Sequence, residues 1–192
     1  MKAIHRVAVY CGSSSGSDPA FQEAARDTAE AMIVNKVDLV YGGGRLGLMG
    51  LMADQVLAQG GKVHGVIPHA LVDLEVAHTG ITELLTVDTM HERKARMTDL
   101  ADAFLALPGG IGTLDELFEA WSWNALGYHA KPFCLLNVDG FWDGLIEFID
   151  HATNKGFMSA QRRRQLLVAD DPEEALQLLD EAALSATKGM VW

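Results

Sequence analysis

Short apolar runs alternate along the chain with longer segments in which apolar residues recur every three or four positions. The short runs are rich in Val, Leu and Ala, and they predict strands at residues 6–11, 37–41, 62–67, 83–87, 102–107, 132–138 and 166–169. The longer segments predict helices from residue 18 onward, over 48–59, 89–100, 114–126, 142–155 and 159–165, and after Pro172. Strands and helices therefore alternate along the whole chain.

The apolar runs are continuous, which is typical of strands that helices cover on both faces. This predicts an α/β fold: an open, Rossmann-like, doubly wound parallel sheet of about seven strands flanked by helices. The sequence shows no repeat and no linker, so we expect a single domain over residues 1–192, with a frayed tail from Ala186. Ligands of such sheets bind beyond the carboxyl ends of the strands, where the strand order reverses.

The net charge of −11 disfavours a nucleic acid or an anionic membrane as partner, because both require a basic face. A small nucleotide requires only a few local donors and is still allowed. Cys11 and Cys134 fall in apolar runs, so we expect reduced, buried thiols in a cytoplasmic protein. The chain lacks a signal-peptide core and any apolar run of about 18 residues, so we expect no membrane span. The histidines show no metal-binding spacing.

The stretch over residues 105–126 reads LALPGGIGTLDELFEAWSWNAL and carries the strongest sign of a ligand site. A buried strand runs into Pro108 and a glycine-rich turn, and a helix follows. Glycines at such a turn let backbone N–H groups approach a ligand closely, and the helix N-terminus adds partial positive charge. We therefore predict a phosphate seat at residues 110–113, with carboxylates close behind it.

Glu116 has two interpretations. Thr113 and Glu116 match a capping box, in which Glu116 would bond back to the backbone N–H of Thr113. In the alternative, Glu116 points into the cleft and acts on a ligand, and Asp115 or Glu119 are candidates for the same role. The two interpretations predict different geometry at the start of the helix.

Glycine-rich loops also follow the first and second predicted strands. Residues 42–47 match the letters of a dinucleotide fingerprint, but the loop follows the second strand, and the third strand ends without an acid for the ribose. A ligand-facing backbone at Gly43 and Gly44 is therefore favoured over NAD or NADP, with a merely structural turn as the alternative. Ser13 has two interpretations: it contacts a hydroxyl or phosphate group of the ligand, or it belongs to a polar loop without a ligand. Three such loops at one edge of a sheet indicate a site there.

The segment MHERKARM begins the helix after the fourth strand and places Arg93 in its first turn. Arg96 lies on nearly the same face, and Lys94 points about 100° away. A cationic fork at the carboxyl edge of the sheet would suit an anion. A solvated basic face, with Thr89 and Glu92 as a capping box, explains the same residues equally well.

Two motifs together, PGGIGTLDE at residues 108–116 and MHERKARM at 90–97, resemble those of the LOG ("lonely guy") family of cytokinin-activating phosphoribohydrolases. CGSSSG, YGGGRLGLMG and PFCLLNVDGFWDGL also fit, in the family's order, so the resemblance covers about residues 5–180. It implies hydrolysis of adenosine 5′-monophosphate, or of its N6-prenylated form, to free base and ribose 5-phosphate. We expect no metal and no cofactor. The resemblance implies a homodimer, which the helix over 114–126, apolar on more than one face, also favours.

The resemblance assigns catalytic roles to Arg93 and Glu116, and phosphate and ribose contacts to residues 110–113. Lys94, Glu75 and Ser122 lie where the family has further substrate contacts, and Ser122 replaces what is often a threonine. The complete set of predicted substrate-binding residues is Ser13, Gly43, Gly44, Glu75, Lys94, Gly109, Gly110, Ile111, Gly112, Thr113, Leu114, Asp115 and Ser122.

In the expected mechanism, Glu116 stabilises positive charge at the anomeric carbon and activates water, while Arg93 orients that carboxylate or the phosphate. The family is often labelled lysine decarboxylase, but that reaction requires a pyridoxal phosphate Schiff base, and Lys94 alone lies near the predicted site. Two alternatives stay open. One is a nucleotide-binding regulatory module without turnover. The other is a phosphoribosyl transferase, although the sequence lacks the Thr-rich phosphate loop typical of that class.

Overall fold

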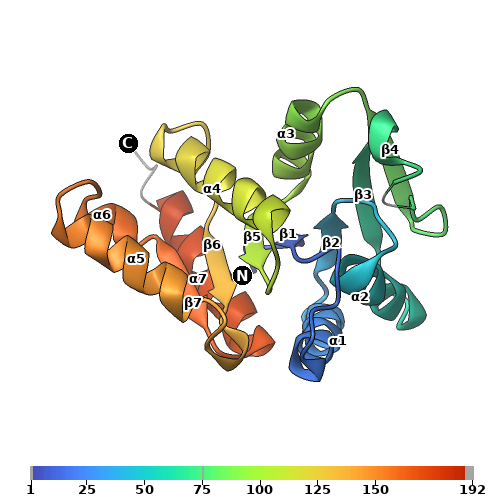
Figure 1. Ribbon diagram of the computed structural model, residues 1–192, viewed down its shortest axis with the longest axis horizontal. Helices are drawn as coiled ribbons and strands as arrows, with labels where there is room; N and C mark the ends of the chain where they lie inside the picture. The colour runs from blue at the N-terminus through green and yellow to red at the C-terminus, as the bar shows by residue number, and fades with distance from the viewer. Residues whose placement is uncertain (1, 75, 189–192) are drawn as a thin grey trace.

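The described residues form a seven-stranded, all-parallel β-sheet with helices on both faces (Figure 1). The computed structural model describes residues 2–74 and 76–188. The strands are β1 (Arg6–Tyr10), β2 (Asp38–Tyr41), β3 (Val63–Pro68), β4 (Glu83–Val87), β5 (Ala103–Ala106), β6 (Phe133–Leu136) and β7 (Leu166–Ala169). The helices are α1 (Pro19–Val34), α2 (Gly47–Ala58), α3 (Met90–Leu100), α4 (Ile111–Ala125), α5 (Asp143–Asn154), α6 (Ala160–Arg163) and α7 (Pro172–Lys188), with short 3₁₀ turns η1 (His69–Leu71) and η2 (Val138–Gly140).

The strands lie in the order β4-β3-β2-β1-β5-β6-β7. From β1 the chain moves outward through β2, β3 and β4, and it then returns to the other side of β1 and moves outward through β5, β6 and β7. The order therefore reverses between β1 and β5, which lie side by side in the middle of the sheet (Figure 1). The predicted doubly wound parallel sheet is confirmed, and its switch point marks where a ligand is expected.

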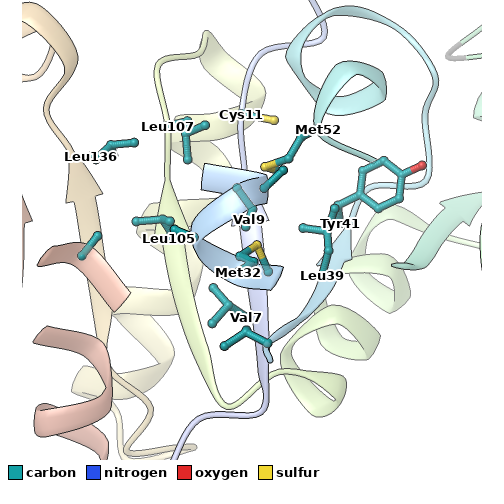
Figure 2. Close-up of a cluster of buried hydrophobic side chains, with 14 of the residues drawn as sticks. Val7, Val9, Cys11, Met32, Leu39, Tyr41, Met52, Leu105, Leu107 and Leu136 are labelled. Atoms are coloured by element: carbon teal, nitrogen blue, oxygen red, sulfur yellow. The ribbon is translucent and has the colours of Figure 1, made fainter. Parts of the chain in front are cut away.

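Each face of the sheet carries its own core, because successive residues of a strand point to opposite faces. Val7 and Val9 of β1 pack with α1, α2 and α7, and Figure 2 shows part of this cluster. Ala8 and Tyr10 of the same strand pack with α3, α4 and α5. Burial on both faces accounts for the continuous apolar runs of the central strands. The edge strand β4 departs from the prediction, because its residues Glu83 and Thr86 are exposed.

Most predicted elements are confirmed, with shifts of one or two residues at their ends. The helix after the glycine turn begins at Ile111, three residues earlier than predicted. The last helix continues to Lys188, past the predicted fraying point at Ala186, and residues 189–192 lie outside the described residues. The connection over residues 68–80 contains η1, where an irregular loop was expected.

Two predicted helix starts are confirmed. The Asp18 carboxylate caps α1 by accepting from the N–H of Ala20 over 2.9 Å, and Thr89 and Glu92 form a capping box at α3. Both cysteines are buried free thiols, as predicted. Among the described residues, no helix combines the length and the apolar character that crossing a bilayer requires.

Candidate active site

The glycine-rich loops after β1, β2 and β5 meet at the carboxyl edge of the sheet, as predicted. The N–H of Gly12 donates to the carbonyl of Pro108 over 3.1 Å, and the N–H of Leu48 donates to the carbonyl of Gly12 over 3.1 Å. Gly47, with φ +59°, passes so close to Ser13 that a Cβ would lie 2.3 Å from the Ser13 carbonyl carbon. The three loops therefore form one continuous floor at the switch point.

A cavity of about 330 Å³ opens on this floor. Its lining comes from the β1 loop, α2, α3 and the start of α4, and comprises Cys11, Gly12, Ser13, Met49, Met90, Arg93, Gly110, Ile111, Gly112, Thr113, Asp115 and Glu116. A second cavity of about 310 Å³ shares Gly12, Ser13 and Gly110 with the first and is lined further by Phe21 and Phe141. Volumes of this order suit small-molecule ligands.

The N-terminus of α4 has the features that favour an anion. Gly110 is the N-cap, and no side chain of the described residues caps this helix end. The N–H groups of the first turn have no acceptor within the helix, so they and the positive end of the helix dipole face the cavity. The predicted phosphate seat therefore lies at a helix N-terminus.

The capping box at Thr113 and Glu116 is wrong. Because α4 begins at Ile111, Thr113 is the third residue of the helix rather than its N-cap. Its side chain is buried over Gly109, where a Cβ would lie 2.1 Å from Thr113 Oγ1. Glu116 lies one and a half turns into the helix and lines the cavity, which is the geometry of the alternative interpretation.

The other glycines of this turn leave open space. A Cβ on Gly110 or Gly112 would meet no heavy atom within 4 Å. The lack of side chains at these two cavity-lining positions leaves the N–H groups accessible to a ligand.

Arg93 is buried against the loop after β2. Its side chain lines the cavity, the residue is only 3% exposed, and Nη2 donates to the carbonyl of Gly42 over 2.8 Å. A Cβ on Gly42 would lie 2.1 Å from that nitrogen, so only glycine leaves room for the guanidinium. The interpretation of a solvated basic face is therefore wrong for Arg93, although Arg96 is exposed.

Lys94 joins α3 to α4. Its Nζ lies 3.0 Å from Asp115 Oδ2 and 2.5 Å from Glu119 Oε2. Burial opposes the charge on this lysine, but the hydrogen bonds to the two carboxylates outweigh burial and raise its pKa. Lys94 thus stays cationic and fixes the two helices that carry Arg93 and Glu116.

The loop after β2 contacts protein atoms. Gly43, with φ +79°, packs against Ile67 and Leu84, its carbonyl accepts from the N–H of His78, and Gly44 forms an isolated bridge with Ala77. These contacts match the structural turn that the sequence left as an alternative.

Two titratable groups at the end of β1 stay neutral. Burial, with a smaller effect from the Glu116 carboxylate, raises the pKa of the Cys11 thiol far above its ordinary value. The same two causes, with Glu119 in addition, raise the pKa of Tyr10. Cys11 lines the cavity as a protonated thiol and is not poised as a nucleophile.

Of the predicted site residues, Ser13, Arg93, residues 110–113, Asp115 and Glu116 share the cavity lining. Gly109 lines the neighbouring cavity, and Leu114 packs against the core beneath α4. Ser122 lines a separate groove two turns further along α4, with Phe118 and Phe157. Glu75 lies outside the described residues.

Four lining residues were missed as individual predictions, namely Cys11, Gly12, Met49 and Met90. Cys11 and Gly12 directly follow a buried strand, and Met90 begins a helix, so their places at the carboxyl edge were available as a signal. Met49 lies in the first turn of the helix predicted over residues 48–59, so the same signal was available for it. Among the described residues, no group of three His, Cys, Asp or Glu side chains is placed to hold a metal.

Comparison with known proteins gives a consistent picture. A family model described as "possible lysine decarboxylase" matches residues 49–179. The cytokinin riboside 5′-monophosphate phosphoribohydrolase LOG2 of Arabidopsis thaliana is 49% identical over 178 residues, which cover 93% of this chain and 84% of that protein. The phosphoribohydrolase LOG of Oryza sativa subsp. japonica is 46% identical over 189 residues, which cover 98% of this chain and 78% of that protein.

Among solved structures, the molybdenum cofactor carrier protein of Chlamydomonas reinhardtii matches with a TM-score of 0.70 at 17% identity, over 93% of this chain and 98% of that one, which shows a shared fold. The extent of the sequence identity is decisive: the chain belongs to the LOG family, whose named relatives are cytokinin riboside 5′-monophosphate phosphoribohydrolases.

Proposed function

We propose that this chain hydrolyses the N-glycosidic bond of adenosine 5′-monophosphate, or of N6-prenylated adenosine 5′-monophosphates, and releases the free base and ribose 5-phosphate. One observation carries the proposal: a single cavity brings together the uncapped N-terminus of α4, Arg93 and Glu116. The names of the relatives, which are about half identical to this chain, support the same reaction.

The phosphate binds at the first turn of α4. N–H groups that lack helical acceptors and the helix dipole both favour an anion at this point. From this turn to Glu116 the helix rises about 6 Å, at 1.5 Å per residue. The ribose would therefore lie between this turn and Glu116, which line the same cavity.

We assign the chemistry to Glu116, because it lines the cavity beside the N-terminus of α4. Lys94 holds Asp115 and Glu119 between α3 and α4. In the reaction, the bond from the anomeric carbon to the base breaks, and its electron pair leaves with the base, which takes up a proton. Glu116 stabilises the positive charge on the ribosyl carbon and accepts a proton from the water that adds to it. Arg93, held by Gly42, orients the anionic groups of the site.

The direct test is chromatography of the purified protein after incubation with AMP and, separately, with isopentenyladenosine monophosphate. The wild type should release free base, and Glu116→Gln should be slower by about 10²-fold or more. Glu147→Gln makes the same chemical change on an exposed face of α5 and serves as the control. The ratio of the two wild-type rates identifies the preferred substrate.

A folded Glu116→Gln variant with normal turnover would remove Glu116 from the mechanism. AMP binding without release of base would instead indicate a regulatory module. The geometry gives less support to that module, because α4 begins at Ile111 and the capping box that the module assigned to Glu116 is not formed.

The proposal extends to a homodimer formed through α3 and α4. Its support is the exposed apolar surface there: Ile111 is 85% exposed, Leu126 is 68% exposed and Met90 is 42% exposed. Such a contact would lie beside the mouth of the cavity. Analytical ultracentrifugation measures the assembly directly, and a monomer at micromolar concentration would contradict it.

We also propose that the chain acts as a single nucleotide-binding domain in the cytoplasm, in keeping with its two free thiols.

A further inference from the structure

The connection between β3 and β4 is held against the loop after β2. The N–H of Arg45 donates to the carbonyl of Val76 over 3.0 Å, and the N–H of His78 donates to the carbonyl of Gly43 over 2.9 Å. An isolated antiparallel bridge joins Gly44 to Ala77. Two segments far apart in the sequence thus form a short, ladder-like contact at the carboxyl edge of the sheet.

One residue of this contact has a strained backbone. Val76 has φ +49°, a left-handed conformation that is rare for a β-branched side chain. Such a conformation persists only where the surrounding contacts determine it. The bond to Arg45 and the neighbouring bridge supply those contacts.

The side chain of His78 locks the segment in place. The residue is only 4% exposed, and its Nε2 lies 2.8 Å from Asp54 Oδ1 on α2. Its Nδ1 accepts from the N–H of Gly80 over 3.3 Å. Because Nδ1 is the acceptor, Nε2 carries the proton and donates it to the Asp54 carboxylate.

The loop that His78 holds also contacts Arg93. The N–H of His78 donates to the carbonyl of Gly43, and the carbonyl of the preceding residue, Gly42, accepts from Arg93 Nη2 over 2.8 Å. Asp54 also lies close to this loop. Burial raises the pKa of Tyr41, the residue before Gly42, and the charge of the Asp54 carboxylate raises it further. The position of the Arg93 guanidinium therefore depends on a loop that His78 holds in place, and Asp54 in turn holds the His78 side chain.

We infer that His78, together with Asp54, is a positioning residue for Arg93. The pair holds residues 76–80 on the loop over 43–45 and thereby sets the Gly42 carbonyl that orients the guanidinium. His78 does not line the cavity. This inference rests on the proposed function, because it assigns a role within the same hydrolysis.

The test is a double-mutant cycle on base release from AMP. His78→Ala should lower kcat by about tenfold to a hundredfold with little change in KM, since a displacement of about 1 Å in a catalytic group has an effect of this size. In an Arg93→Ala background, the same change should alter kcat by less than about twofold, because the residue it positions is gone.

Two further variants separate positioning from general stability. His78→Gln keeps an N–H donor near Nε2 and should restore most of the wild-type kcat. His69→Ala changes an exposed histidine in the same connection and should leave kcat unchanged. In hydrogen exchange, the N–H of Arg45 should exchange faster in His78→Ala than in the wild type.

The outcomes are distinct. Independent effects of His78→Ala and Arg93→Ala on kcat, or a His78→Ala variant with wild-type kcat, would overturn the positioning role and leave the proposed function standing. A wild-type protein that releases no base would overturn both.

Discussion

Replacement of Gly112 by Ala should raise the stability of the protein and lower its activity at the same time. Gly112 is the second residue of α4, it lies outside the left-handed region, and a Cβ there would meet no atom within 4 Å. Within a helix, Ala is favoured over Gly by about 0.5–1 kcal/mol. We expect the free energy of unfolding to increase by about that amount, which corresponds to a Tm higher by about 1–4 °C for a chain of this length.

The same methyl group should weaken the phosphate seat. Gly112 lines the cavity, so the added carbon occupies space through which a phosphate oxygen reaches the N–H groups of the first turn. Loss of one hydrogen bond to a charged group costs about 1.5–3 kcal/mol. At about 1.4 kcal/mol for each factor of ten, kcat/KM for AMP should fall by about 10-fold to 100-fold.

Gly144 provides a matched control for this prediction. It is the second residue of α5, a Cβ there also meets no atom within 4 Å, and it lies outside both cavities of the site. Gly144→Ala should therefore raise Tm to a similar extent and leave kcat/KM unchanged. Thermal unfolding followed by circular dichroism and chromatographic kinetics measure the two effects. Normal kcat/KM in Gly112→Ala would refute a phosphate at this helix N-terminus, and a lower Tm would refute the reasoning about open space.

Two further predictions concern stability. Lys36 has φ +53° just after α1, where the N–H groups of residues 36 and 37 donate to the carbonyls of Ile33 and Met32. This helix-ending motif favours glycine. Lys36→Gly should therefore stabilise the protein by about 1 kcal/mol in thermal unfolding, and an unchanged Tm would contradict this. Burial first, and the Lys131 charge second, lower the pKa of His129 from 6.5 to about 4. Between pH 6.5 and 4, the unfolded chain therefore binds a proton at this histidine that the folded protein does not bind. The free energy of unfolding should fall as pH falls through this range. The expected decrease is about 1–2 kcal/mol, because solvent screens the half-exposed ring. His129→Asn, whose amide oxygen can still accept from the Lys131 N–H, should lose this slope in urea unfolding across the range, and a slope equal to that of the wild type would refute the assignment.

The two capping-box patterns show how far local sequence determines the structure. Thr89 and Glu92 form the predicted box at α3. Thr113 and Glu116 have the same spacing, yet α4 begins at Ile111, and the Thr113 side chain packs over Gly109 instead of capping. The letters are equivalent, so the difference arises from tertiary contacts that a local pattern does not contain.

The same limit applies to the rest of the site. The alternation of apolar runs was sufficient to predict the sheet and the convergence of the glycine loops at one edge, because the order of elements restricts the topology. The burial of Arg93 was not predictable, since it depends on Gly42, which lies 51 residues earlier in the chain. Ser122 shares a helix with Glu116 but lines another groove, because the two residues are separated by nearly two turns of α4.

The environment of Lys94 bears on the "possible lysine decarboxylase" description of the family model. A lysine that forms a Schiff base with pyridoxal phosphate must lose its proton, so its site normally lowers its pKa through burial or neighbouring positive charge. Lys94, which is ion-paired with the cavity-lining Asp115, has the opposite environment: burial lowers its pKa, but its hydrogen bonds to Glu119 and Asp115 outweigh burial and raise it. An amine held as a cation between two carboxylates is a poor nucleophile, so these residues do not fit a pyridoxal phosphate site. They do fit a fixed positive charge that joins α3 to α4 through Asp115 and Glu119, beside the cavity that Arg93 and Glu116 line.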